Sequence, residues 1–381
     1  MKPDLLITNG MVLDPERKVH KTGSIAVKNG KIVEAPASGD GAAGRVIDAE
    51  GCLVVPGLID FHAHVFTPGS ELGVRADSAL LPQGVTTVVD AGSAGLANYD
   101  NFVRTTVAFN QMRVFSLINM SVTGLATLRY HEDVNPKFHD VTALKKIFEK
   151  YRGQLIGLKI RQSRDIVGDM GLEPLKSTLN VAEEIGCPVV VHVTDPPCSL
   201  EDIAVLLRPG DVFCHLFHGT GSTILGEDGR ILPKIKEARE RGVIFDGANG
   251  KLHFSFDIAR KAIAEGFLPD VISTDLTPLT LYHDYVFGLP YLMSKYLNLG
   301  VNVTDIVAAC TSTPARLLGM QGRLGTLAPG AEADITILKL VTHKTKFKDT
   351  FDNILVGEEL LIPRMTVLNG SIAYRQIDFN T

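Results

Sequence analysis

The middle of the chain alternates between short apolar runs and segments whose apolar residues recur at helical spacing. One such segment places Leu175, Leu179, Ala182 and Ile185 on a single helix face. Alternating strands and helices are typical of a parallel sheet with crossover helices. The apolar runs give eight strand candidates, near residues 58–64, 85–90, 114–120, 156–160, 189–192, 212–215, 243–246 and 271–275. Eight such units predict an α/β fold of the (β/α)8, or TIM barrel, type.

The two ends of the chain follow a different pattern, with short alternating runs and turn residues. Asn9-Gly10, Asn29-Gly30 and Asn369-Gly370 each follow a strand-like run, and Asn-Gly in this position predicts a hairpin. Because both ends share this style, we expect them to form one small β-sandwich domain. Its residues are 1–54 and 322–381, and residues 55–321 form the barrel.

Length and charge narrow the class of protein. The chain has 381 residues, and a barrel of about 250 residues leaves room for a second, smaller unit. It has 38 basic and 43 acidic residues for a net charge of -5, and neither sign is concentrated in a long run. This balance argues against nucleic acid and anionic membranes as partners. The expected partner is a small-molecule substrate, and a homo-oligomer is left open.

Cysteine usage and the amino terminus bear on the compartment. The five cysteines form no C-x-x-C pair, and an odd number argues against a complete disulfide framework. The start, MKPDLLITNG, lacks an apolar core, and no stretch reaches the roughly 18 apolar residues of a membrane span. We therefore expect a cytoplasmic protein with no membrane association.

Candidate metal ligands follow several of the predicted strands. His62 and His64 lie two residues apart, so that a strand presents both imidazoles on one face, where they can share a divalent ion. His192, His215 and Asp275 each end a short apolar run. Since the carboxyl ends of barrel strands meet at one face, these side chains are expected to gather there. A carboxylate such as Asp275 can both bind metal and accept a proton from the attacking water.

Lys159 stands inside an apolar run, residues 155–160, that predicts a buried strand. A free ammonium there is costly to desolvate, so Lys159 needs a partner or a chemical change. If CO2 adds to the amine, the resulting carbamate is an anion whose two oxygens can bridge two cations. The alternative is a lysine whose amine reaches water from the strand end. Taken together, the residues predict a two-metal hydrolase, with zinc expected although imidazole and carboxylate suit several divalent ions.

The same residues carry a resemblance. The motif PGLIDFHAH at residues 56–64, the lysine of GLKIR, the two later histidines, the aspartate, and PARLLGM followed by GTLAPGAEADITIL resemble the amidohydrolase superfamily. The similarity extends over essentially the whole chain. It implies that His62, His64 and Asp275 hold one zinc, that His192 and His215 hold the other, and that carboxylated Lys159 bridges them.

Within the superfamily the chain looks dihydroorotase-like, with two departures. Val65 and Phe66 follow the His-x-His where dihydroorotases usually have an arginine, and Leu276 and Thr277 follow Asp275 where they tend to have a histidine. The segments KIRQSRDIVGDMGLEPLK and FCHLFHGTG are more similar to a related subgroup of metal-dependent deacetylases. This resemblance implies hydrolysis of an acetyl or acyl ester or amide of a small carboxylate-bearing substrate. N-acetyl amino acids and O-acetyl α-hydroxy acids are examples.

Other residues are candidates for substrate contact. Arg161 and Arg164 follow the lysine strand and can clamp a carboxylate, although a solvated loop arginine explains each equally well. His218 can hydrogen-bond substrate, and Ser93 lies in the βα loop DAGSAGL that is expected to face it. His253 and His283 follow later strands and lie either at the mouth of the barrel or on the surface.

Three other functions compete with a deacetylase. A cyclic-amide hydrolase of the dihydroorotase or hydantoinase type uses the same metals, so that only the pocket separates the two. Deaminases of the superfamily generally use one metal and lack the bridging lysine. A metal-free scaffold protein is disfavoured because all six ligand positions, those of His62, His64, Lys159, His192, His215 and Asp275, are intact.

Overall fold

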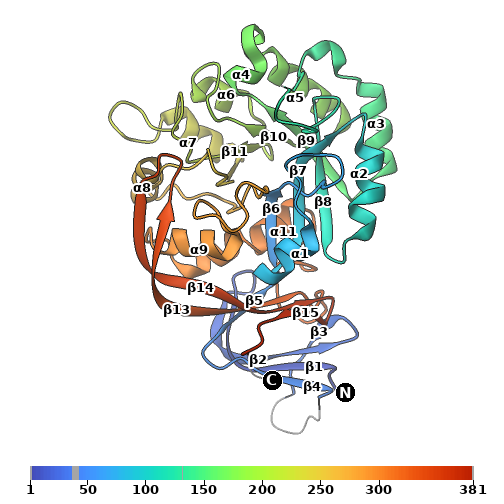
Figure 1. Cartoon of the computed structure of the whole chain (residues 1–381), viewed down its shortest axis with the longest axis vertical. Helices are drawn as coiled ribbons and strands as arrows, with labels where there is room; N and C mark the ends of the chain where they lie inside the picture. Colours follow the sequence, from blue (N-terminus) through green and yellow to red (C-terminus); the bar gives the residue numbers. More distant parts are fainter. Residues whose placement is uncertain (1, 37–42, 131, 380–381) are drawn as a thin grey trace.

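A curled parallel sheet forms the centre of the protein. The computed structural model describes residues 2–36, 43–130 and 132–379. Seven strands pair in the order β12-β11-β10-β9-β8-β7-β6, so each strand lies beside its neighbours in the sequence (Figure 1). They are β6 (Leu58–Ala63), β7 (Val85–Gly95), β8 (Arg113–Asn119), β9 (Leu155–Arg161), β10 (Val189–His192), β11 (Val212–Cys214) and β12 (Ile244–Asp246).

The predicted eighth strand lies where it was expected but is not a regular strand. Residues 271–276 form isolated parallel bridges on both sides, Asp246 with Val271 and Ala63 with Leu276. The amide of Thr274 donates to the buried carboxylate of Asp60 at 3.0 Å instead of to a neighbouring strand. Such a side-chain acceptor competes with regular ladder bonding. The segment still closes the barrel between β12 and β6.

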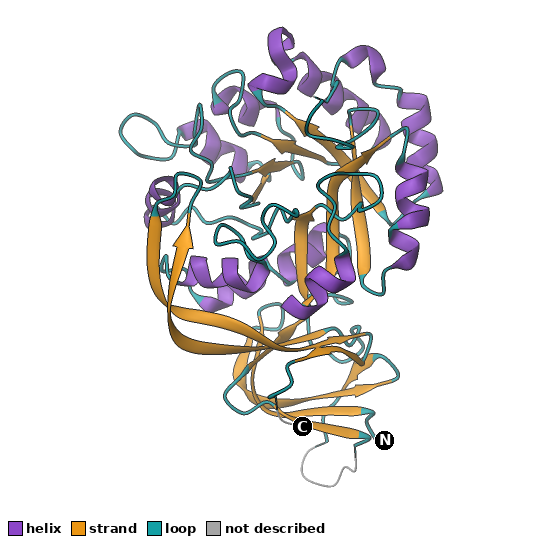
Figure 2. Ribbon diagram, viewed as in Figure 1, coloured by secondary structure: helices purple, strands orange, loops and turns teal. Residues whose placement is uncertain are grey.

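Helices cover the outside of the barrel sheet (Figure 2). The helix expected from the spacing of Leu175 and Leu179 is α5, and Ser199 caps α6 by accepting a hydrogen bond from the Glu201 amide. The α-helices are α1 (Ala76–Leu80), α2 (Tyr99–Thr105), α3 (Val141–Lys150), α4 (Arg164–Val167), α5 (Glu173–Ile185), α6 (Leu200–Leu206), α7 (Pro233–Glu240), α8 (Phe256–Ala264), α9 (Leu289–Leu297), α10 (Val303–Ala309) and α11 (Ser312–Leu317). Among the described residues, none of the helices has the length and apolar character needed to cross a membrane.

Both chain ends contribute to a second, mixed sheet, as the sequence predicted. Its strands pair in the order β15-β14-β13-β5-β1-β2-β3, and β4 pairs with β1. They are β1 (Leu5–Asp14), β2 (Val19–Lys28), β3 (Lys31–Val33), β4 (Arg45–Asp48), β5 (Leu53–Pro56), β13 (Ile335–Lys348), β14 (Ile354–Leu368) and β15 (Ser371–Arg375). The long hairpin of β13 and β14 leaves this sheet and extends along the barrel towards α8 (Figure 1). The exact domain boundaries stay a prediction.

The Asn-Gly pairs behave in two ways. Asn29-Gly30 joins β2 to β3 and Asn369-Gly370 joins β14 to β15, which confirms both hairpins. The hairpin expected at Asn9-Gly10 is wrong, because both residues lie inside the continuous strand β1 at a shift in its register with β2. A Cβ on Gly10 would lie 2.4 Å from the Val54 side chain, so the glycine permits close packing against β5 at this bulge.

A small apolar cluster fills the barrel beneath its carboxyl-terminal face. Its buried members alternate along the barrel strands and are Phe61, Val89, Phe115, Leu117, Val190, Val212, Cys214, Ala248 and Val271. A much larger cluster packs the helices against the outside of the sheet. The strands are thus held on both faces, and their carboxyl ends are rigid platforms for side chains.

Candidate metal centre

A cavity of about 170 Å³ opens at the carboxyl ends of the barrel strands. It brings together all six predicted metal ligands and Arg161, which arrive from separate parts of the chain. Its lining residues are His62, His64, Lys159, Arg161, His192, His215, Lys251, His253, Asp275, Thr277 and Thr280, with an apolar part formed by Leu72, Leu125, Leu128, Leu252 and Leu279.

One group of donors, here the aspartate half, consists of His62, His64 and Asp275. Asp275 Oδ1 lies 3.2 Å from His64 Nε2 and 3.5 Å from His62 Nε2. A tetrahedral ion with ligand distances of about 2.0–2.1 Å separates its ligand atoms by about 3.3–3.4 Å. The spacing and the donor chemistry of this group therefore fit a zinc ion.

A hydrogen bond to the ring nitrogen that faces away from the cavity orients the imidazole of His64. Its Nδ1 lies 2.9 Å from the hydroxyl of Ser93. The amides of Ser93 and Val65 both donate to the buried carboxylate of Asp90, at 2.7 and 2.8 Å. Ser93, expected to face substrate, thus has its hydroxyl on the imidazole of His64. Such a contact keeps Nε2 directed at a metal, as is usual for ligating histidines.

A second group, here the imidazole half, consists of His192, His215 and His253. The ring centroids lie 4.3 Å apart for His192 and His215 and 4.1 Å for His215 and His253. Nδ1 of His215 donates to the carbonyl of Ala248 at 2.7 Å, which leaves Nε2 as a free lone pair. The ligand atoms of the three residues lie within 4.8 Å of one another, so this group can hold a second ion.

His253 is a member that the sequence did not single out. Its Nδ1 lies 2.8 Å from the hydroxyl of Thr194, and its Nε2 lies 3.6 Å from Asp275 Oδ2. It therefore contacts the carboxylate of the aspartate half while packing on the imidazole half. His283, which the sequence treated in the same way, is exposed. No spacing distinguishes the two histidines, because both follow a barrel strand at some distance.

Two of the predicted ligands follow their strands with an unusual backbone. His215 has φ of 70° and Asp275 has φ of 52°, a region that residues other than glycine seldom adopt. Such conformations cost of order 1–3 kcal/mol and are concentrated at functional sites. Here they turn both side chains towards the cavity at the point where the strand ends.

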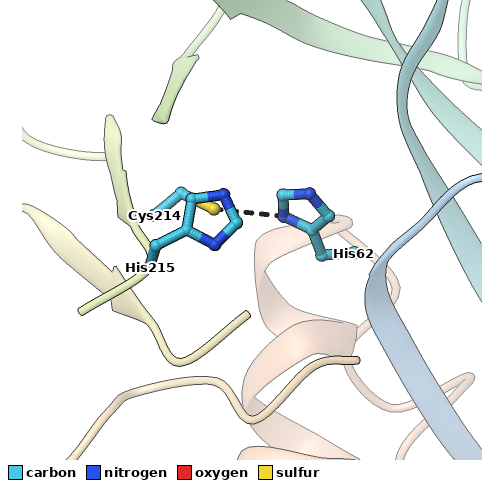
Figure 3. Close-up of side chains that lie close together, drawn as sticks. All are labelled: His62, Cys214 and His215. Carbon is cyan, nitrogen blue, oxygen red and sulfur yellow. Dashed lines mark hydrogen bonds between the residues drawn. The ribbon is translucent and has the colours of Figure 1, made fainter. Parts of the chain in front are cut away.

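Lys159 is buried in β9 between the two halves. Its Nζ lies 3.9 Å from Cys214 Sγ, and among the described residues no carboxylate forms an ion pair with it. Gly92 leaves room for the lysine stem, because a Cβ there would lie 2.7 Å from Lys159 Cβ. Cys214 Sγ also lies 3.1 Å from His62 Nδ1, as Figure 3 shows. The thiol thus forms the floor of the centre, a position that its place inside an apolar run did not reveal.

Burial favours the neutral imidazoles of His62, His192, His215 and His253. It lowers the pKa of His62, His192 and His215 well below 6.5, and nearby positive charges lower these pKa values further. Lys159 contributes to the shift at all three, which shows that its amine is close to both halves. Burial also lowers the pKa of His253 to about 4, against the opposing charge of Asp275. At neutral pH these side chains therefore present lone pairs, the form that binds metal.

Two further buried carboxyls support the ring of strands. Asp246 Oδ2 lies 3.4 Å from His62 Nδ1, and Asp246 accepts a hydrogen bond from the Ser273 hydroxyl at 2.6 Å. Asp60 accepts one from the Thr274 hydroxyl at 2.6 Å. Burial raises the pKa of Asp60 to about 7 and that of Asp246 to about 6. Both carboxyls fasten the irregular eighth segment, which carries Asp275.

Of the candidate substrate-binding residues Arg161, Arg164 and His218, only Arg161 lines the cavity. Its guanidinium forms an ion pair of 2.5 Å with Glu132, a buried residue that also accepts from Asn119 at 3.2 Å. Arg164 is mostly exposed and donates to the carbonyl of Pro196, away from the cavity lining. His218 is fully buried and also absent from that lining. Glu132 lies in a long segment without periodicity, so no pattern in the sequence pointed to it.

Comparisons with known proteins identify the family of the chain. The model of the Amidohydrolase family matches residues 53–372. The chain belongs to the amidohydrolase family. It is 32% identical over 344 residues to a deacetylase from Agrobacterium fabrum, covering 90% of this chain and 82% of that protein. The crystal structure of an adenine deaminase matches with a TM-score of 0.89 at 29% identity, over 98% of this chain and 100% of that one. The structure of a dihydroorotase matches with a TM-score of 0.88 at 31% identity, over 98% of both chains.

Membership confirms three predictions made from the sequence. The superfamily resemblance is correct, the fold is that of the amidohydrolases, and the protein is a hydrolase acting on C–N bonds. Its relatives include proteins named deacetylases and proteins named dihydroorotases, so the family leaves the substrate open.

Proposed function

We propose that the protein is a binuclear metal hydrolase that removes an acetyl or other acyl group from a small carboxylate-bearing substrate. N-acetyl amino acids and O-acetyl α-hydroxy acids are the substrate classes to test first. The observation that carries the proposal is the convergence of two donor groups, Lys159 and Arg161 on one cavity. The similarity to a deacetylase from Agrobacterium fabrum supports it.

The donor set supports a separate group of ligands for each ion. His62, His64 and Asp275 would hold one zinc, and His192 and His215 would hold the other. Such ions would polarise the substrate carbonyl and lower the pKa of a bound water molecule. The amine of Lys159 would attack CO2 and lose a proton to give a carbamate, which the two ions would share. This modification replaces a buried cation that lacks a counterion by an anion with two metal ligands.

Asp275 is suited to move the proton. One of its oxygens faces His62 and His64, and the other lies 3.6 Å from His253 Nε2. In the proposed reaction Asp275 accepts a proton from the attacking water and returns it to the leaving nitrogen or oxygen, acting as base and then as acid. The contact with His253 would keep the second oxygen directed across the centre during both transfers.

The remaining lining indicates the kind of substrate. Besides Lys159, the cavity is lined by the cationic side chains of Arg161 and Lys251, and five leucines form an apolar part. Glu132 holds one edge of the Arg161 guanidinium, which leaves the other donors for a bidentate contact with a carboxylate. The pocket therefore favours a small acid with an apolar side chain.

A panel of substrates tests the proposal. Zinc-loaded protein is assayed on D- and L-N-acetyl amino acids, O-acetyl α-hydroxy acids, dihydroorotate and hydantoins. Lys159→Ala is the active-site variant, and Lys145→Ala, which changes an exposed lysine paired with Glu184, is its control. We expect acetate release that depends on Lys159 but not on Lys145. Ring opening without acetate release would overturn the deacylase proposal.

A cyclic-amide hydrolase is the second candidate, because a solved dihydroorotase has the same fold at 31% identity. Two positions disfavour it. Val65 and Leu276, where dihydroorotases usually have an arginine and tend to have a histidine, respectively, are fully buried apolar side chains. The arginine that grips the substrate carboxylate in dihydroorotases is thus missing after the His-x-His, and Arg161 supplies a cation from another strand.

A further inference from the structure

The hairpin of β13 and β14 carries a turn from the chain-end sheet to the active-site loops. This turn, residues 349–353, is called the hairpin tip below. It reaches the barrel beside α8, far along the hairpin from the sheet in which β13 and β14 begin (Figures 1 and 2). The barrel loop that it contacts follows β12 and comprises residues 247–255. That β12 loop carries Lys251 and His253, which both line the cavity.

Four hydrogen bonds join the tip to this part of the barrel. The amide of Thr350 donates to the carbonyl of Phe254 at 2.9 Å, and the amide of Phe254 donates to the Thr350 hydroxyl at 3.1 Å. That hydroxyl donates in turn to the carbonyl of Lys251 at 3.0 Å. The carboxylate of Asp349 accepts from the Phe256 amide at the start of α8, at 3.0 Å. The backbone on both sides of His253 is therefore fixed by residues of another sheet.

The tip also contacts the loop that follows β11. A Cβ on Gly219 would lie 2.6 Å from the ring of Phe351, so the ring packs directly on the backbone there. The two loops are joined to each other by the amide of Ser255, which donates to the carbonyl of Phe217 at 2.8 Å. Since the β11 loop begins at His215, the tip supports the loops of two members of the imidazole half.

A buried lysine outside the metal centre fastens the base of the tip. Lys295 on α9 is fully buried, and its Nζ donates to the carbonyls of Lys348 at 3.0 Å and Tyr285 at 2.7 Å. The amine also lies 4.8 Å from the ring centroid of Phe254. A buried amine is costly unless its donors are satisfied, and here carbonyls from two segments satisfy it. Lys295 thereby holds the base of the hairpin tip, at Lys348, against the β12 loop, which the tip itself also contacts.

We propose that the hairpin tip is a positioning element of the active site, which sets the place of Lys251 and His253 without touching substrate. The chain-end sheet thus has a role in substrate binding through residues 349–353. The kinetic part of this inference rests on the proposed function. Its structural part does not, because loop order can be measured without a substrate.

Hydrogen exchange of the metal-loaded protein tests the structural part. Thr350→Val removes the hydroxyl at nearly constant shape, and Thr345→Val is the control, because the Thr345 hydroxyl contacts only His343 on its own strand among the described residues. Phe351→Ala is a second variant whose half-exposed ring can be removed with little risk to folding. We expect amides of residues 249–256 to exchange about fivefold faster or more in Thr350→Val and Phe351→Ala, with α5 unchanged. Wild-type exchange rates in both variants would overturn the proposal.

Kinetics on any substrate that the wild type hydrolyses test the consequence for binding. We expect KM to rise several-fold in Thr350→Val and kcat to fall by a smaller factor, with zinc content retained, because the Thr350 hydroxyl bonds the Lys251 carbonyl directly. An equal change in Thr345→Val, or a loss of zinc with unchanged KM, would contradict a positioning role. If the wild type hydrolyses nothing on the panel, the proposed function fails, and the exchange rates still decide whether the tip orders the loop.

Discussion

The two halves of the centre differ in origin and in charge. The aspartate half takes two histidines from one strand, β6, and adds the carboxylate of Asp275. The imidazole half takes His192, His215 and His253 from three different segments and contains no carboxylate among its members. A divalent ion in the aspartate half would meet one negative charge from its ligands, whereas an ion in the imidazole half would meet none.

This difference in charge explains why a modified Lys159 would suit the centre better than an unmodified one. An unmodified lysine would add a positive charge between two groups that are to hold cations, which electrostatics opposes. A carbamate would supply the negative charge that the imidazole half lacks.

The largest effect is expected for Lys159→Met, which keeps the volume of the stem and removes the amine. We predict a loss of at least about 10³-fold in kcat/KM, because the anion shared by both ions is gone. Zinc should fall from two to one per chain, with the loss from the imidazole half. Metal analysis beside the assay checks this, and retention of both ions with normal turnover would show that no bridging anion is needed.

Asp275→Asn changes the aspartate half while leaving an oxygen ligand. We predict a fall of about 10²–10⁴-fold in kcat, because an amide cannot accept the proton, with most of the zinc retained. Asp257→Asn, on the exposed face of α8, is the control and should behave as wild type. Turnover by Asp275→Asn at the wild-type rate would assign the proton transfer to another group.

Arg161 lies beside the imidazole half, where it pairs in register with His192. Arg161→Met should raise KM for an N-acetyl amino acid about 10–100-fold, the effect of losing hydrogen bonds between charged groups. The KM for the matching carboxamide, which has no negative charge, should change little. An equal rise for acid and carboxamide would mean that Arg161 does not bind the carboxylate.

The smallest expected effect is on stability and concerns His218. This histidine is buried near the imidazole half but does not line the cavity. Burial lowers its pKa to about 3, and its ring nitrogens have no side-chain hydrogen-bond partner among the described residues. Below its ordinary pKa of 6.5 the unfolded chain takes up a proton that the folded chain does not, so wild-type stability falls as pH falls from 6.5 towards 3.

His218→Leu removes this contribution. Its free energy of unfolding relative to wild type should therefore increase by about 1.4 kcal/mol for each pH unit below 6.5. Denaturant titrations of both proteins at pH 7 and pH 5 measure the difference. A constant difference would show that the buried imidazole is protonated in the folded state.

The sequence predicted those ligands whose position follows from the barrel itself. His62, His64, Lys159, His192, His215 and Asp275 each lie at or near a strand end, and the parallel arrangement brings those ends together whatever the loops do. The regular strands were likewise predictable from apolar runs. The eighth segment was not, because the bond from Thr274 to Asp60 depends on contacts between distant parts of the chain.

The residues that the sequence missed, or left open between the barrel mouth and the surface, lie where no periodicity applies. His253 is on a loop, Glu132 is in a long irregular segment, and the hairpin tip comes from the far end of the chain. Their contacts arise only when loops pack on one another, so local patterns carry no information about them. Asn9-Gly10 shows the converse, since a strong turn signal was overridden by pairing of β1 with strands on both sides.

We propose that a carbamate on Lys159 joins the two halves. Carbon-13 NMR of protein loaded with zinc in labelled bicarbonate tests it most directly, with Lys159→Met as the control. We predict one slowly exchanging carbamate carbon in the wild type that is absent from the variant. A protein with two zinc ions and full activity but no such signal would show that no carbamate on Lys159 joins the two halves.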